Sequence, residues 1–239
     1  MPRTSMPTKA TGIMNGPTMV TARRALGITK TYIAAAVFMS VMAIAVWGNV
    51  MYVGSSTGTP VLAVPLDMIP LLMLATPVVM LFVYDKNNGV LEYLLSLGMT
   101  QRDIYMRYLR ATLLLTSVFS IIFAPVVLAY TYATQGAGTV ATILPIPLVA
   151  IPFSLAAVAF MVVAMMAFSS LQKTRAGSNQ PLGLIVGWLV TIPGYLVPFT
   201  FSFEAAIYAD LAIAAIIAVV VFIFLMSSEK LIRREKFLP

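Results

Sequence analysis

The carboxylates are the residues whose type could do chemistry in this chain, because it contains no histidine and no cysteine. The chain can therefore form no disulfide, no Cys/His zinc site and no triad with a histidine base. Paired carboxylates remain an option for general acid–base catalysis. However, the chain has only eight acidic residues, and no cluster of them occurs within its long apolar runs. We therefore predict no catalytic residue and no metal site.

One carboxylate, Asp67, does lie inside an apolar run. An ionisable side chain within a membrane is costly and often functional, so Asp67 could line a translocation path. A contact between helices is the alternative. Glu204 and Asp210 lie near the start of the last apolar run, where we expect the membrane interface to solvate them.

The elements that must position these residues are long and apolar. Hydrophobic residues make up 60% of the 239 positions, charged residues make up 10%, and the mean hydropathy is +0.96. Soluble proteins carry about 25% charged residues, and about 20 apolar residues suffice to span a bilayer. We predict a single all-α, polytopic membrane domain over residues 1–239, with six transmembrane helices. The predicted spans are Tyr32–Val53, Val61–Tyr84, Tyr108–Ala133, Ile143–Phe168, Leu182–Phe201 and Ala205–Met226.

The basic residues predict the orientation of these spans. The 15 Lys and Arg residues lie in the N-terminal segment, between spans two and three, between spans four and five, and in the tail. The alternate connections, 54–60, 134–142 and 202–204, contain none. By the positive-inside rule, both termini are cytoplasmic in a multi-pass protein of the plasma membrane. The net charge of +7 then reflects the flanks of spans and predicts no nucleic-acid partner.

Three further segments flank or interrupt the bundle of residues 32–226. Residues 1–31 are polar, but Met19–Lys30 alternates apolar and basic residues, which favours a short interfacial helix; a solvated basic flank is the alternative. Residues 227–239 form a basic cytoplasmic tail. Pro193, Gly194 and Pro198 predict a broken or re-entrant helix before span six, with a single kinked span as the alternative.

The stretch between spans two and three has the pattern of a helix, a turn and a second helix. Asn87 or Asn88 can cap a first helix, whose apolar residues recur at helical spacing from Val90. Gly98 is suited to a left-handed stop. Thr100 and Asp103 then have the spacing of a capping box, with Met99 and Ile104 at the positions of a hydrophobic staple. The short first helix must bury its leucines against the membrane, its own bundle or a soluble partner.

This stretch, YDKNNGVLEYLLSLGMTQRDIYMRYL, resembles the cytoplasmic loop of ABC-2 type transporter permeases. The family has Thr where this chain has Val90, and a proline near the turn where it has Gly98–Met99. The six-span layout is also similar to the family. The matching residues are Asp85, Lys86, Gly89, Leu91, Glu92, Leu94, Leu95, Gly98 and Thr100.

The resemblance implies that the short helix is a coupling helix of an exporter and docks on a separate ATP-binding cassette subunit. The chain would not be an enzyme and would hold no cofactor, because ATP and Mg²⁺ would bind in the partner. A second permease chain, identical or related, would complete the pathway in the lipid bilayer. The implied docking residues are Gly89, Val90, Leu91, Glu92, Leu94, Leu95 and Gly98, followed by Arg102 and Asp103.

Two other classes of function share this hydropathy. A non-transporting membrane anchor or accessory subunit of a larger complex would need no coupling helix. A secondary transporter would depend on Asp67 or Glu204.

Overall fold

The computed structural model describes residues 16–28, 34, 75–138, 140, 144–171, 189 and 203–231. This part of the chain is helical and contains no strand, which confirms the all-α prediction for these residues. The first and fifth predicted spans, Asp67 and the break before span six lie outside the described residues, apart from isolated positions. The helices are α1 (Pro17–Ile28), α4 (Ala75–Asn87), α5 (Val90–Ser96), α6 (Gln101–Gln135), α8 (Pro145–Leu171) and α10 (Phe203–Leu231).

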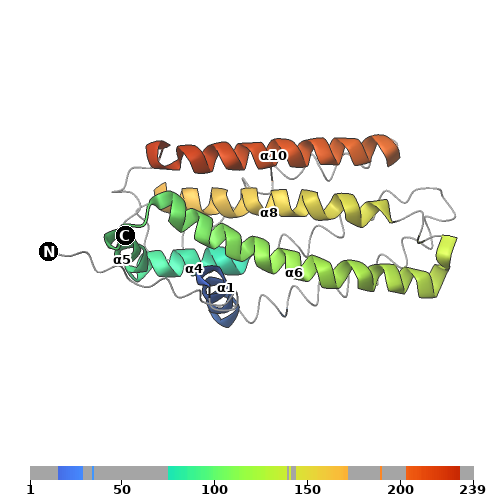
Figure 1. Cartoon of the computed structure of the whole chain (residues 1–239), viewed down its shortest axis with the longest axis horizontal. Coiled ribbons are helices and arrows are strands. Elements are labelled where there is room, and N and C mark those ends of the chain that lie inside the picture. Colours follow the sequence, from blue (N-terminus) through green and yellow to red (C-terminus); the bar gives the residue numbers. More distant parts are fainter. Residues whose placement is uncertain are drawn as a thin grey trace, which may run out of the picture.

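Figure 1 shows α4, α6, α8 and α10 extending lengthwise along the long axis of the molecule. Helix α8 packs against α4, α6 and α10, and α6 likewise contacts α4, α8 and α10. Helix α1 lies across the bundle and contacts α4 and α6. The short α5 lies at one end, where it connects the end of α4 to the start of α6.

Within the described ranges, two helices are long and apolar enough to cross a membrane by length and composition, over Gln101–Tyr130 and Ile207–Ser228. Helix α8 carries a shorter apolar segment, Ile151–Ala167. These helices overlap the predicted third, sixth and fourth spans, and α4 overlaps the end of the second. The described residues thus indicate a membrane protein, while the count of six spans stays a prediction.

Helix α6 is longer than a membrane crossing requires. It contains 35 residues, and its charged residues all lie in the first ten positions, up to Arg110. The charge-free part, from Ala111 to Gln135, rises roughly 37 Å at 1.5 Å per residue, against a hydrocarbon core of about 30 Å. The first turns of α6 can therefore project beyond the apolar layer as a continuous helix.

The core at the α5 end is built from aromatic side chains of three helices. Phe82 of α4 stacks on Tyr105 of α6 with ring centroids 6.0 Å apart, and meets Tyr108 edge-on at 5.2 Å. Tyr105 also contacts Phe224 of α10, at 6.3 Å. Such pairs add about 0.5–1.5 kcal/mol each beyond area burial. The region around the start of α6 is consequently a packed core rather than a loose connector.

Further along α6, three buried hydroxyl groups lie on one face at intervals of four residues. The side chains of Thr112, Thr116 and Ser120 each donate a hydrogen bond to the carbonyl oxygen four residues earlier. This satisfies donors that would be costly if left unpaired in an apolar surrounding. Small side chains of this kind allow neighbouring membrane helices to approach closely.

A helix in the N-terminal segment is confirmed by α1. The alternative of a solvated flank is wrong for these residues, because Thr21, Ala22 and Ala25 are buried. Their burial follows from contacts with α4 and α6, which cover the face that carries these small side chains. A position of α1 at a membrane interface stays a prediction.

Candidate functional site

The candidate site comprises the end of α4, the whole of α5, the first turns of α6 and the helix α1 that lies against them. It begins at Gly89, the residue before α5, which has φ 71° and ψ 8°. This left-handed conformation favours glycine, because a Cβ there clashes with the backbone. The constraint is the backbone conformation and not crowding by other residues. Among the described residues, an added Cβ would make one contact within 4 Å, with Glu92 Oε2 at an ordinary 3.7 Å.

The prediction that Asn87 or Asn88 caps α5 is wrong. The residue before α5 is Gly89, and no side chain bonds to the first turn of the helix. Asn87 is the last residue of α4, and the Asn88 side-chain amide donates to the Tyr84 carbonyl oxygen at 2.8 Å. Asn88 therefore satisfies the open end of the preceding helix rather than the start of the next one.

The end of α5 is a two-bond Schellman motif. Gly98 has φ 85°, its N–H donates to the Leu95 carbonyl at 3.0 Å, and the Met99 N–H donates to the Leu94 carbonyl at 3.2 Å. This pair of bonds is the signature of a helix stopped by a left-handed residue. The left-handed stop predicted at Gly98 is confirmed.

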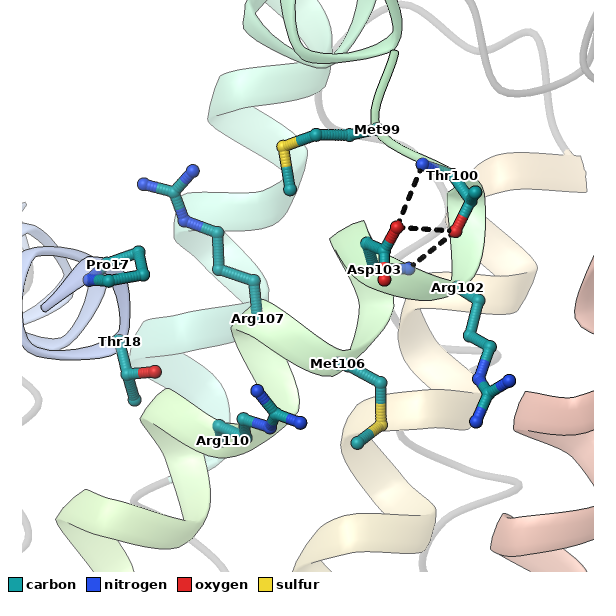
Figure 2. A pocket seen from close by; sticks show the side chains of 9 residues that line it. All are labelled: Pro17, Thr18, Met99, Thr100, Arg102, Asp103, Met106, Arg107 and Arg110. Carbon is teal, nitrogen blue, oxygen red and sulfur yellow. Dashed lines mark hydrogen bonds between the residues drawn. The ribbon is translucent and has the colours of Figure 1, made fainter. Parts of the chain in front are cut away.

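Thr100 caps α6 with a complete capping box (Figure 2). The Asp103 N–H donates to Thr100 Oγ1 at 3.1 Å, and the Thr100 N–H donates to Asp103 Oδ2 at 3.2 Å. The Thr100 hydroxyl also donates to Oδ2, at 2.8 Å. The side-chain and backbone hydrogen bonds from Thr100 lower the pKa of Asp103. The predicted capping box is confirmed, and it joins α5 to α6 through a corner held by local hydrogen bonds.

Helix α5 has a buried face and an exposed face. Leu91 is 1% exposed and Leu94 is 9% exposed, so both belong to the core. Tyr93 and Leu97 are 63% and 62% exposed. The sequence predicts that the leucine face is buried against the membrane, the protein's own bundle or a soluble partner. The structure shows that Leu91 and Leu94 are buried in the protein's own bundle. A partner would meet the opposite face.

The predicted docking residues divide accordingly. Leu91 and Leu94 are covered by the protein itself, and Gly89, Val90 and Leu95 are half-buried. Three exposed residues were not among the predicted docking residues. They are Tyr93 and Ser96 on α5 and Leu97 directly after it. The exposed residues available to a partner at this end are Glu92, Tyr93, Ser96, Leu97, Gly98, Arg102 and Asp103.

An ion pair with a buried carboxylate ties α1 to this site. Arg24 Nη2 lies 2.6 Å from Asp85 Oδ1, and Arg24 Nη1 lies 3.1 Å from Asp85 Oδ2. The Tyr108 hydroxyl donates to Asp85 Oδ2 at 2.6 Å. The Asp85 side chain is only 1% exposed, whereas Arg24 is 40% exposed. The bidentate contact with the guanidinium and the hydrogen bond from the hydroxyl offset the cost of burying this carboxylate.

A second contact of α1 involves a neighbouring arginine of α6. Arg107 Nε donates to Thr21 Oγ1 at 2.9 Å, and the Thr21 hydroxyl donates to the Pro17 carbonyl at 2.9 Å. The ion pair and the Arg107 contact both join residues far apart in sequence, so local spacing does not reveal them. In the sequence, the ion pair is indicated only by its two halves. These are the Arg23–Arg24 pair among small apolar residues and Asp85 at the end of a predicted span.

Two ionisable side chains, those of Asp210 and Lys86, are buried in the structure. Asp210 of α10, which the sequence places at a solvated interface, is 1% exposed and its Oδ1 has no hydrogen-bond partner within the described part of the chain. Lys86 is also buried, and this burial lowers its pKa. Within the described ranges, no group of three or more Asp, Glu, His or Cys could hold a metal ion.

The fold and the site define a helical protein with membrane-spanning character and a capped helical corner at one end. Comparison of the chain with protein-family models, curated proteins and solved structures finds no match.

Proposed function

We propose that this chain is the membrane permease subunit of an ATP-driven ABC-2 type exporter. In this proposal the chain crosses the membrane six times, with both termini in the cytoplasm. The observation that carries the proposal is α5, a seven-residue helix between two left-handed glycines, joined by a capping box to a 35-residue helix. A partner that moves α5 would move α6 with it.

Motion of α5 would reach α6 through the corner between the two helices. The Schellman bonds of Gly98 and Met99 and the capping box of Thr100 leave no unbonded linker between the two helices. Leu91 and Leu94 in turn join α5 to the bundle. Rigid-body motion is a common way to couple a cytoplasmic event to a membrane segment, and it needs such a stiff connection.

The docking surface in this proposal is the exposed face of α5 with the residue that follows the helix, and it is formed by Glu92, Tyr93, Ser96 and Leu97. Tyrosine is one of the residue types enriched among the anchors of protein interfaces, and the exposed Leu97 adds apolar surface near Tyr93. The chain has no Gly-x-x-x-x-Gly-Lys-Ser/Thr sequence. ATP and Mg²⁺ would therefore bind in a separate subunit.

The proposal is tested by purifying the full chain from its native membrane in mild detergent. The copurifying proteins are identified by mass spectrometry, and ATP hydrolysis by the complex is measured. We expect an ATP-binding cassette subunit with the phosphate-loop sequence. Leu97→Asp and Tyr93→Ala should reduce its recovery at least ~10-fold, the loss expected when a central anchor is removed.

Tyr132→Ala is the matched control, because Tyr132 is 62% exposed but lies near the other end of α6. Equal recovery of the ATPase with all three variants would contradict docking on α5. A complex that contains no ATPase would instead favour a membrane anchor or accessory subunit. Transport that persists without an ATPase but is lost on replacing Asp67 would favour a secondary transporter.

A further inference from the structure

A cavity of about 540 Å³ lies beside the capped corner, between the start of α1 and the first turns of α6. Figure 2 shows its lining, which includes three arginines of α6. They are Arg102, Arg107 and Arg110, and the acidic residue among the lining side chains is Asp103. The cavity volume falls in the range of small-molecule sites, about 300–1,000 Å³.

The charge of the cavity is positive. None of the three arginines forms an ion pair with a carboxylate in the described part of the chain. Asp103 is the carboxylate in the lining: its Oδ2 accepts two hydrogen bonds from Thr100, and it attracts Arg102 and Arg110 without forming an ion pair with either. Arg107 is held beside the cavity by its Nε contact with Thr21. Among the described residues, the cavity therefore presents guanidinium groups that no intramolecular acid neutralises through an ion pair.

The cavity lies along the charged first turns of α6, directly before the charge-free part of that helix. Arg110 is the last charged residue before the charge-free stretch that begins at Ala111. If α6 crosses a bilayer along that stretch, Arg110 lies at the membrane interface, and Arg107 and Arg102 follow about 5 and 12 Å further along the helix. Met99 and Met106 add apolar, adaptable side chains to the same lining. This combination suits a ligand with an anionic group and an apolar portion nearby.

We propose that this cavity binds a phosphate-bearing anion, either the headgroup of an anionic lipid or a soluble phosphate compound. Guanidinium groups match the geometry of phosphate oxygens and retain their charge at all physiological pH values. The inference is independent of the proposed function, since it holds whether or not α5 docks an ATPase.

The test uses the intact chain in neutral detergent and the double variant R102Q/R110Q. Both residues are exposed, whereas Arg107 is half-buried and bonded to α1. Arg23→Gln is the matched control, because Arg23 is exposed on α1 and does not line the cavity. Unliganded thermal midpoints verify that the variants are folded.

In the lipid arm, delipidated protein is incubated with phosphatidylglycerol or phosphatidylcholine, and retained lipid is counted by native mass spectrometry. In the soluble arm, inorganic phosphate is titrated against chloride at equal ionic strength, and the thermal midpoint is measured. We expect selective phosphatidylglycerol retention or phosphate stabilisation, weakened by roughly fivefold for each arginine removed.

Selective lipid retention with no response to inorganic phosphate identifies a lipid headgroup as the ligand. Stabilisation by inorganic phosphate, lost in the double variant, identifies a soluble phosphate compound. The inference is overturned if wild type, R102Q/R110Q and Arg23→Gln behave alike in both arms. It is also overturned if phosphatidylcholine is retained as well as phosphatidylglycerol and inorganic phosphate does not stabilise the wild type more than R102Q/R110Q.

Discussion

Arg24 binds both carboxylate oxygens of Asp85 across 61 positions of sequence, and so fastens α1 to the end of α4. The pair is asymmetric in its exposure: the carboxylate is buried, while the guanidinium remains partly solvated. Because Tyr108 donates to the same carboxylate, three helices meet at one side chain. Asp85 is thus the point where the N-terminal helix becomes part of the bundle.

The first prediction concerns this ion pair. We expect Arg24→Gln to lower the free energy of unfolding by about 2 kcal/mol, below the cost for a fully buried pair because Arg24 is 40% exposed. The loss arises because Asp85 would remain buried and, among the described residues, would keep the Tyr108 hydroxyl as its side-chain partner. Chemical unfolding in mixed micelles measures the change.

Arg23→Gln is the control for Arg24→Gln, since Arg23 is the exposed neighbouring residue of the same type. It should change stability by less than about 0.5 kcal/mol. Combining Arg24→Gln with Asp85→Asn should restore part of the loss, because the unpaired charge is then removed. Equal effects of Arg23→Gln and Arg24→Gln would contradict a role for the ion pair.

The second prediction concerns the left-handed glycine before α5. Gly89→Ala should destabilise the protein by about 1–2 kcal/mol, the cost of a Cβ in the left-handed region. Gly89→Asn should cost less, because asparagine tolerates this conformation. Gly27 offers a control within helix α1: nothing lies within 4 Å of an added Cβ there, so Gly27→Ala should be neutral or stabilising. Thermal unfolding ranks the variants, and a neutral Gly89→Ala would argue against the left-handed turn.

The third prediction concerns the cap of α6. Thr100→Ala should cost about 1 kcal/mol, whereas Thr100→Ser should retain most of the stability because its hydroxyl can make the same bonds. Loss of the cap should also loosen the corner, seen as faster amide hydrogen exchange at the start of α6. Equal exchange rates in Thr100→Ala and wild type would be inconsistent with a structural role for the box.

Acid should reveal the same capping box. Because hydrogen bonds from Thr100 lower the pKa of Asp103, the box contributes stability above the carboxyl's unfolded pKa and loses it as pH falls through the folded pKa. The stability difference between wild type and Thr100→Ala should therefore shrink below about pH 4. A difference that stays constant on acidification would exclude Asp103 as its source.

The fourth prediction concerns orientation in the membrane, and the absence of native cysteine allows a clean test. Ser96→Cys, exposed at the end of α5, should react with a membrane-impermeant maleimide only after the cytoplasmic side is opened. Ala137→Cys, exposed beyond the far end of α6, should react from outside in intact cells. Labelling of the Ser96→Cys variant in intact cells would reverse the proposed orientation.

The features that the sequence determined by itself are those whose hydrogen bonds close within a few residues. The Gly98 stop and the box between Thr100 and Asp103 were predicted correctly, since each bond joins residues at most five positions apart. The helical character of the apolar segments follows from the same locality, because every backbone bond of a helix is internal to it. The Asn88 prediction failed because an asparagine between two helices can serve either end.

Tertiary structure alone decided which face of α5 is available and what Arg24 does. Periodicity places Leu91 and Leu94 on one face of α5, but their burial depends on which helices lie against that face. Asp85 and Arg24 carry no mutual spacing that a helical period can reveal, and the buried carboxylate of Asp210 resembles an interfacial one in sequence. Local bonds are encoded in spacing, whereas burial and long-range pairing arise only when the helices pack.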